Sequence, residues 1–160
     1  MATAYDVNTQ LLLGEEMYLY VTSANTPVAF ATSCSVQIDG ETIDTSNKMS
    51  GRWNSNLAGK NSYTISTDAL YTQAEGLYSF DALMKKMISG GSDAKLEWTI
   101  GKAKDYANND YELDTTKPHY KGIGFITSLS LNAGNNEVCS CSITITGSGA
   151  IEHSEGTAGA

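Results

Sequence analysis

Residues 122–147, GIGFITSLSLNAGNNEVCSCSITITG, form the clearest β-hairpin pattern of the chain and give its strongest fold signal. The central turn, residues 133–136, is rich in residue types that tolerate positive φ. Before the turn, one strand face is predicted to hold Ile123, Phe125, Leu129 and Leu131, and the other mostly Gly122, Gly124, Ser128, Ser130 and Asn132. After the turn, an apolar row alternates with a hydroxyl row: Cys139, Cys141, Ile143 and Ile145 against Ser140, Ser142, Thr144 and Thr146. Each strand therefore has one apolar face and one small, uncharged polar face.

A second hairpin with the same division is predicted from residues 15–22 and 28–38, around a turn at residues 25–27. In its first strand the apolar residues are Met17, Leu19 and Val21, against Glu16, Tyr18, Tyr20 and Thr22. In its second strand they are Val28, Phe30, Cys34, Val36 and Ile38, against Ala29, Ala31, Ser33, Ser35 and Gln37. Further strands are predicted at residues 61–71 and 94–101. These patterns predict a mainly β, antiparallel sandwich or barrel-like domain.

One flanking helix is predicted at residues 79–89. Ser79 is a suitable N-cap, Asp81 lies in the first turn, where the helix dipole favours negative charge, and Gly90-Gly91 ends the helix. The apolar residues Phe80, Leu83, Met84, Met87 and Ile88 fall on a single stripe. We interpret this stripe as core packing.

Three segments lack a clear period. Residues 39–60 are predicted to form a long loop, and loops of this length inside a domain are usually functional or disordered. Residues 105–118 are polar, and residues 148–160 are rich in Gly and Ala, as in a flexible C-terminal tail. The domain is therefore predicted to cover residues 1–147.

Composition fits an ordinary globular domain. The chain has 160 residues, of which 41% are hydrophobic and 18% charged. No apolar run approaches the roughly 20 residues that a membrane span needs. No basic residue precedes the short apolar run at residues 11–13, so no secretory signal peptide is expected and the cysteines should stay reduced.

The basic residues are confined to the middle of the chain. All ten lie between Lys48 and Lys121, whereas acidic residues occur throughout the sequence. Both terminal hairpins are therefore free of positive charge. Because nucleic-acid binding depends on Lys and Arg that neutralise phosphates, such a surface disfavours adhesion to DNA.

No catalytic or cofactor site is predicted. His119 and His153 have no serine or cysteine nucleophile in a recognisable motif, and no phosphate-binding loop is present, so we expect neither an enzyme nor a bound cofactor or metal. The cysteines are Cys34, Cys139 and Cys141, and the spacing of the last two is not that of a zinc site. We interpret all three as small core residues.

The order of these elements and several phrases resemble the major tail tube proteins of long-tailed bacteriophages. The phrases are DGETIDTSNKMSGRWNSNLAGKNSYTISTDALY at residues 39–71, SFDALMKKM at 79–87, GFITSLSL at 124–131 and SITITGSG at 142–149. The resemblance covers roughly residues 14–150. It implies a virion structural protein that self-assembles into stacked hexameric rings, forming a hollow tail tube through which DNA passes into the host.

The resemblance also implies partners and site residues. The partners would be other copies of the chain, a tape measure protein, a terminator protein and DNA in passage, with no membrane contact and assembly in the host cytoplasm. Hairpins at residues 14–38 and 120–147 would line the lumen, which predicts lumen-facing Ser33, Ser35, Gln37, Ser128, Ser130, Asn132, Ser140, Ser142 and Thr144. The loop at residues 39–60 would contact the adjacent ring, with Lys48, Arg52 and Trp53 as anchors.

Two alternatives remain open at this point. A carbohydrate- or protein-binding β-sandwich module could use Tyr18, Tyr20 or Trp53 as contact residues. A tube protein of a contractile tail or an injection system would have a related fold. The sequence does not separate these tube classes, because the difference depends on a sheath partner.

Overall fold

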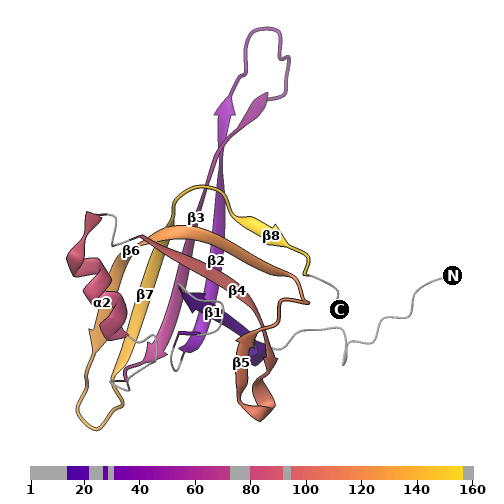
Figure 1. Cartoon of the computed structure of the whole chain (residues 1–160). Helices are drawn as coiled ribbons and strands as arrows, with labels where there is room; N and C mark the ends of the chain where they lie inside the picture. Colours follow the sequence, from indigo (N-terminus) through magenta and orange to yellow (C-terminus); the bar gives the residue numbers. More distant parts are fainter. Residues whose placement is uncertain (1–13, 22–26, 29–30, 73–79, 92–94, 157–160) are drawn as a thin grey trace, which may run out of the picture.

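Eight antiparallel strands and one α-helix make up the described part of the chain (Figure 1). The computed structural model describes residues 14–21, 27–28, 31–72, 80–91 and 95–156. The strands are β1 (Met17–Val21), β2 (Ala31–Asp44), β3 (Asn56–Leu70), β4 (Lys95–Asp105), β5 (Asp110–Leu113), β6 (His119–Asn132), β7 (Ser140–Gly147) and β8 (Glu152–Ser154). The helix is α2 (Phe80–Ser89), and the short 3-10 helices are η1 (Gly14–Glu16) and η3 (Tyr106–Asn108). The predicted fold class, mainly antiparallel β with one flanking helix, is confirmed.

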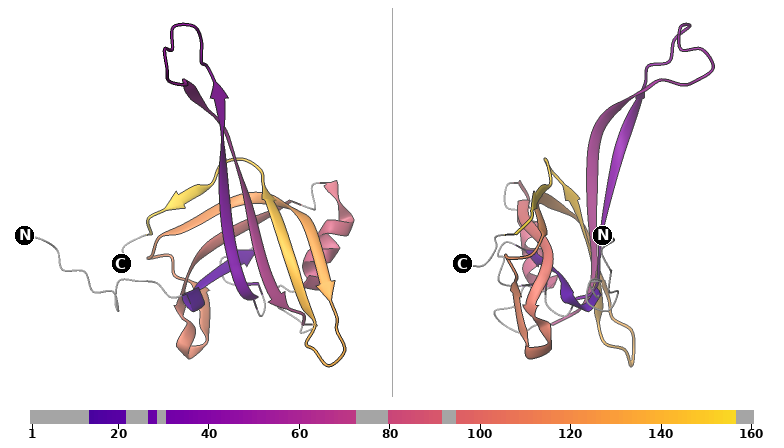
Figure 2. Two further views of the ribbon diagram at one scale, coloured as in Figure 1. Left: turned by 180° about the vertical axis from the view of Figure 1, so that it is seen from behind. Right: turned by 90° about the vertical axis from the view of Figure 1, so that its right-hand side faces the viewer.

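The sheet has the strand order β1-β4-β6-β7-β3-β2, with β5 added on β4 and β8 on β6. Strand β6 joins two layers, because residues 120–125 pair with β4 and residues 124–132 pair with β7. We call β2, β3, β7 and the second half of β6 the four-stranded layer. Figure 2 shows it from behind and edge-on, packed against the layer that contains β1 and β4.

The core lies between these two layers. One layer contributes the buried residues Tyr63, Ile65, Ile126, Ile143 and Ile145, and the other contributes Leu19, Val21, Leu96, Trp98 and Ile100. This alternation along β3, β4 and β7 is the period-2 pattern of strands that bury one face. The predicted strands at residues 61–71 and 94–101 are therefore confirmed as parts of β3 and β4.

Glycines allow β6 to approach the aromatic centre of the core. The Tyr63 and Trp98 rings meet edge-on, with centroids 5.4 Å apart. A Cβ at Gly122 would lie 2.8 Å from both the Trp98 ring and Tyr63 Oη. Tyr63 also donates a 2.7 Å hydrogen bond to the Ile123 carbonyl, which fixes its ring in place. No larger residue at Gly122 fits without moving this pair.

The predicted N-terminal hairpin is wrong in its pairing. β1 pairs with β4 and β2 pairs with β3, so the segments at residues 15–22 and 28–38 are not partners. Among the described residues, the two segments meet at Tyr20, which bridges Pro27, and at the Val28 amide, which donates to the Leu19 carbonyl at 2.9 Å. Residues 22–26 and 29–30, with most of the predicted turn, lie outside the described residues. Both faces of β1 are covered, which a strand at one end of an isolated hairpin could not achieve.

Half of the predicted long loop at residues 39–60 is strand. β2 continues to Asp44 and β3 begins at Asn56, so the loop spans only residues 45–55. The end of β2 beyond Gly40, the loop and the start of β3 up to Lys60 form a two-stranded arm that projects from the body (Figure 1). Nearly all residues of the arm are exposed, so neither face shows the apolar alternation by which a strand is recognised in a sequence.

A β-bulge changes the predicted faces of β6. The register with β7 shifts between Ile126 and Ser128. Phe125 lies opposite Thr146 and Ser128 lies opposite Thr144, so Phe125 shares a face with Ser128. Ile126 is buried instead. The extra residue of a bulge reverses the alternation, which a strict period of two cannot predict.

Two polar segments contain strands that the sequence did not predict. Residues 105–118 hold η3 and β5, which folds back on β4. Residues 152–154, within the predicted flexible tail, form β8 and pair with β6. Here Lys121 and Glu152 form an ion pair at 3.3 Å, and the Tyr120 and His153 rings stack at 4.8 Å. The flexible tail is thus wrong for residues 152–154, while a domain boundary at residue 147 stays a prediction.

The predicted helix is confirmed at Phe80–Ser89, although Ser79 lies outside the described residues. Gly90 and Gly91 both have positive φ, as expected where a helix ends. Phe80 and Leu83 are buried in the core. Met87 and Ile88 are exposed, so the apolar stripe is only partly used for packing within the chain. Among the described residues, no helix has the length and apolarity to cross a bilayer.

Candidate functional site

The outer surface of the four-stranded layer, which we call the hydroxyl face, is polar except for Phe125 and Leu70. Its cross-strand rows are, in order, Ser33–Asp68–Ser142–Ser130, Ser35–Ser66–Thr144–Ser128 and Gln37–Thr64–Thr146. The pair Ser140–Asn132 lies at the other end, next to the first row. The structure thus brings all of the residues predicted to face a lumen onto one surface. The opposite side of the same strands faces the core, as Ile65, Ile143 and Ile145 show.

Strand β3 adds residues to this face that the prediction omitted. Thr64, Ser66 and Asp68 lie between the β2 and β7 residues in each row. β3 comes from the middle of the chain, whereas the predicted face used only the terminal hairpins. The alternation of polar Thr64 and Ser66 with apolar Tyr63 and Ile65 along β3 was the sequence signal that could have assigned β3 to this face.

Asp68 is the charged residue at the centre of the hydroxyl face. Ser142 donates to its carboxylate at 2.6 Å and Ser33 donates at 3.0 Å. The hydrogen bond from Ser142, followed by that from Ser33, lowers the pKa of the Asp68 carboxyl below its usual value. No Lys or Arg occurs in the strand segments 31–39, 62–70, 124–132 and 140–147. The face is therefore polar with negative charge only.

The tip of the arm, residues 45–55, has a defined hydrogen-bonded structure. The Thr45 amide donates to the Ser55 carbonyl at 2.8 Å, and the Ser55 amide donates to Ser46 Oγ at 2.9 Å. The Ser46 amide donates to the Asp44 carboxylate at 2.8 Å. Hydrogen bonds from the Ser46 side chain and backbone lower the pKa of Asp44. The tip is thus a folded unit at the end of the arm.

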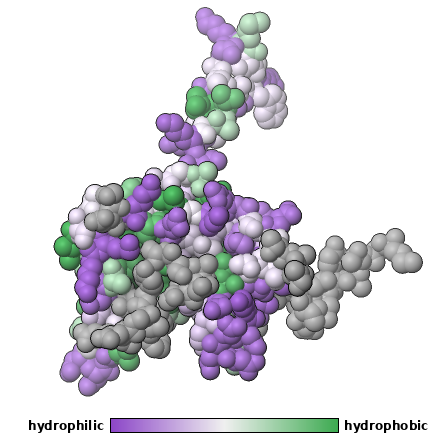
Figure 3. Space-filling view, in the orientation of Figure 1, coloured by the Kyte–Doolittle hydropathy of each residue, from purple (hydrophilic) through white to green (hydrophobic). Residues whose placement is uncertain are grey.

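The predicted anchors Lys48, Arg52 and Trp53 all lie on this tip and are exposed. Trp53 is 84% exposed and Met49 is 95% exposed. On the stem below, Ile43 pairs across the strands with Leu57, and both are more than half exposed. Figure 3 shows apolar surface on the arm, separated from the body. Such an exposed apolar group at the end of a projection is typical of a protein–protein contact.

The four-stranded layer has two edges without a strand partner among the described residues. β2 ends the strand order on one side. On the other side, β6 pairs with β4 only up to Phe125, which leaves residues 127–132 with β7 as their one strand partner in the described part of the chain. Neighbouring strands are antiparallel throughout, so β2 and β6 run in opposite directions. Open edges of this kind are templates for pairing with another chain.

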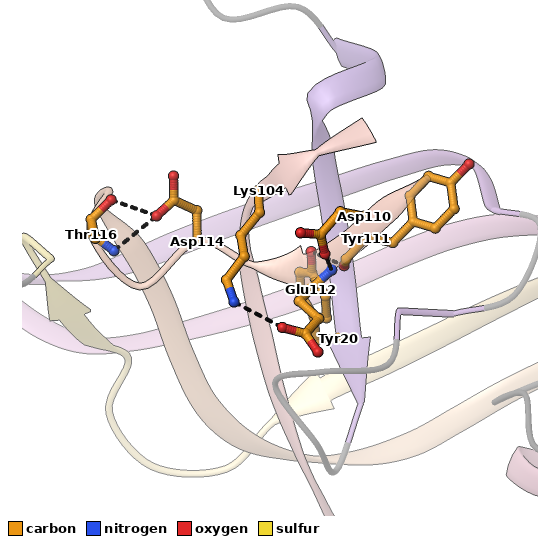
Figure 4. A network of polar contacts seen from close by, with 7 residues as sticks. All are labelled: Tyr20, Lys104, Asp110, Tyr111, Glu112, Asp114 and Thr116. Carbon is orange, nitrogen blue, oxygen red and sulfur yellow. Dashed lines mark hydrogen bonds and ion pairs between the residues drawn. The ribbon is translucent and has the colours of Figure 1, made fainter. Parts of the chain in front are cut away.

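The tyrosines proposed for a ligand platform do not form one. Tyr20 is 1% exposed, and its hydroxyl donates to the Tyr111 carbonyl at 2.7 Å (Figure 4). Burial, followed by the nearby Tyr18, raises the pKa of Tyr20 above its usual value. Tyr18 packs against the Tyr111 ring at 5.6 Å. The polar network in Figure 4, which includes a 2.8 Å ion pair between Lys104 and Glu112, joins β4 to β5.

The cysteines occupy three different environments. Cys141 is buried, with its thiol 3.3 Å from the Ala69 carbonyl, which confirms its predicted core role. Cys139 is half-buried, and Cys34 is exposed on the edge strand β2, so the core prediction is wrong for Cys34. Within the described ranges, no group of three or more His, Cys, Asp or Glu could hold a metal ion.

Comparisons with known proteins agree with this geometry. Residues 13–153 match the family model described as phage tail tube protein. A similar fold occurs in the virion of a native gene transfer agent particle, with a TM-score of 0.68, 18% identity and coverage of 90% of this chain and 99% of that chain. The tail of the empty particle, refined with C6 symmetry, gives the same values.

Two further structures show the same fold. The SPP1 tail tube has a TM-score of 0.66 at 12% identity, covering 92% of this chain and 80% of that chain. A chain in the anti-feeding prophage baseplate has a TM-score of 0.54 at 12% identity, covering 91% and 96%. A search of curated proteins by sequence found no significant match.

Proposed function

The chain belongs to the phage tail tube protein family, and on this premise we propose that it assembles into six-membered rings that stack into a hollow tube for DNA. The observation that carries the proposal is the hydroxyl face, a polar surface without positive charge that lies between two open strand edges. The C6 symmetry of the similar gene transfer agent tail supports a ring of six.

Strand pairing between copies closes the ring. The β2 edge of one copy pairs with residues 127–132 of β6 in the next copy, and the antiparallel alternation continues because each copy contributes an even number of strands. Four strands from each of six copies give a barrel of about 24 strands, wide enough to enclose an aqueous channel. The contact is heterologous and leaves no open edge once the ring is closed.

The hydroxyl face then forms the wall of the channel. Its side chains are mostly small, which leaves width for a duplex. Asp68 places one carboxylate per copy on this wall, and each carboxylate is held by Ser33 and Ser142. A wall with negative charge repels phosphates, so DNA passes without adhering.

The arm joins one ring to the next. Beyond Gly40, its strands extend by about five residues, or roughly 17 Å, before the tip begins. Lys48, Arg52 and Trp53 on the tip contact the adjacent ring, where the exposed Trp53 ring becomes buried. Burial of an aromatic side chain in such a contact contributes roughly 2 kcal/mol or more per copy.

The role is structural rather than enzymatic, without a cofactor, and the protein belongs to the virion tail. Its other partners are a tape measure protein within the tube, a terminator protein at the tube end and DNA in passage, with assembly in the host cytoplasm. A tube within an injection system is a second candidate, and the similar fold in the anti-feeding prophage baseplate favours it. The sugar-binding alternative loses Tyr20 as a contact residue, because that side chain is buried.

Electron microscopy of the purified chain at increasing concentration tests the proposal. We expect rings and stacked tubes with a central channel. A matched variant replaces residues 45–55 with Asn-Gly, which suits a two-residue hairpin turn between Asp44 and Asn56. This variant should form rings that do not stack. A strictly monomeric parent chain at high concentration would refute the proposal.

A further inference from the structure

Two exposed apolar patches lie at opposite ends of the four-stranded layer, both on the side that faces the core. We propose that helix α2 of one copy covers the apolar row of β2 in the adjacent copy, so that each subunit completes the core of its neighbour. This inference rests on the proposed ring and adds to it a second, side-chain contact between copies.

The first patch is the row Cys34, Val36 and Ile38 on β2. In register these residues lie beside Thr67, Ile65 and Tyr63 of β3, which are all buried, so the row faces the same side as the core. Val36 is nevertheless 41% exposed and Ile38 is 62% exposed. An open hollow of about 590 Å³ borders Ile38, between the base of the arm and residues 149–151. The core side of β2 is thus incompletely covered within one chain.

The second patch is on α2. The helix packs on the β6 end of the layer, with Phe80 and Leu83 in the core. Met87 and Ile88, in its last turn, are 37% and 76% exposed. Figures 1 and 2 show α2 at the opposite end of the four-stranded layer from β2. Leu131, near the end of β6, is also exposed, at 48%.

Pairing of the open edges brings the two patches together. The core-side rows of the layer run from Cys34 through Thr67 and Ile143 to Leu129, and from Val36 through Ile65 and Ile145 to Ile126. When β2 of one copy continues this layer beside β6 of the next, its core side comes to lie on the side where that copy holds α2. The occupant of the β2 row is therefore a second copy of this chain, and no other protein is required.

Cysteine cross-linking tests this contact. In a Cys34→Ser background, we pair Val36→Cys with Ile88→Cys and oxidise assembled tubes. Within one chain β2 and β6 are separated by three strand spacings, about 14 Å, and α2 lies at the β6 end of the layer (Figures 1 and 2). This separation exceeds the roughly 7 Å between Cα atoms that a disulfide tolerates. Any disulfide between these positions therefore joins two copies. We expect a ladder of covalent oligomers on a non-reducing gel.

The matched control is Ser35→Cys with Ile88→Cys in the same background, because Ser35 lies next to Val36 but on the hydroxyl face. We expect at least tenfold more covalent dimer from the Val36 pair than from this control. If the Val36 variant fails to assemble, the native Cys34 paired with Met87→Cys provides the same test. Tubes that form with equal cross-linking in both pairs would overturn the α2 contact and leave the ring intact. A parent chain that forms no rings would overturn both.

Discussion

Adding lysines to the hydroxyl face should convert a channel that DNA passes into one that DNA binds. The variant combines Ser66→Lys on β3 with Ser128→Lys on β6. Both residues are exposed and lie in the same cross-strand row, separated by Thr144. Their side chains are about two strand spacings, or roughly 10 Å, apart, so mutual repulsion is largely screened at 0.1 M salt.

The expected magnitude follows from the charge of the face. The face carries two charged residues, Asp68 and Asp39, so each copy changes from −2 to neutral. Two lysines in each of six copies add about twelve positive charges per ring. If half of them contact phosphates, the slope of log K against log salt is about −5. Raising the salt from about 50 to 200 mM should then weaken DNA binding roughly a thousandfold.

The assay is co-sedimentation of fluorescent duplex DNA with assembled tubes across a salt series. Parent tubes should retain little DNA, and the variant should retain DNA at low salt and release it at high salt. The control variant carries Ala107→Lys and Thr115→Lys, which add equal charge at exposed positions outside the hydroxyl face. Equal retention by both lysine variants, or none by either, would refute the placement of this face in the channel.

Three further predictions concern the arm, the carboxylate and the core. Trp53→Ala should leave the melting temperature of the monomer unchanged, because the ring is 84% exposed, but should shorten tubes in electron micrographs; tubes of normal length would show that Trp53 makes no stacking contact. The pKa of Asp68 is lowered in the folded chain, so its stabilising contribution is present above pH of about 4 and is lost as the pH falls through the folded pKa. Melting temperatures between pH 7 and 3 should therefore fall more steeply for the parent than for Asp68→Asn, and parallel curves would contradict this. A Cβ at Gly147 would overlap the Tyr63 ring, which is fixed by its hydrogen bond to the Ile123 carbonyl. Gly147→Ala should thus cost about 1–3 kcal/mol in urea unfolding, whereas Gly14→Ala, with open space around it, should be neutral.

Local patterns predicted the elements that bury one face against the chain's own core. β7, the buried half of β3 and α2 all show the expected periodicity, and the structure confirms them. The alternation of Ser142 and Thr144 with Ile143 and Ile145 was enough to place the polar residues on one surface. This is why the predicted lumen residues lie together even though β1 and β2 do not pair with each other as predicted.

Long-range pairing and irregular register could not be read from the sequence. β1 has β4 as its partner, about 80 residues away in the chain, and no local signal specifies that choice. The bulge near Thr127 places Phe125 on the hydroxyl face. The strands of the arm are exposed on both faces, so their sequence has no apolar alternation that would predict them. Asp68 was missed because the strand that carries it was not assigned to the face.

The proposed assembly would also explain the apolar residues left exposed in one chain. Val36 and Ile38 on β2, Ile88 on α2 and Trp53 on the arm would be unfavourable on an isolated monomer. Each lies on an element for which the proposed ring or stack would provide a neighbour. On this proposal, their exposure is a property of the unassembled subunit.

A cryo-electron microscopy map of the assembled chain tests the central claim most directly. We predict rings of six copies in which β2 of each copy pairs with residues 127–132 of the next, forming a barrel of about 24 strands. Ser66, Asp68 and Thr144 should point into the channel. A map in which these residues face outward, or in which lysine and arginine side chains line the channel, would contradict the account.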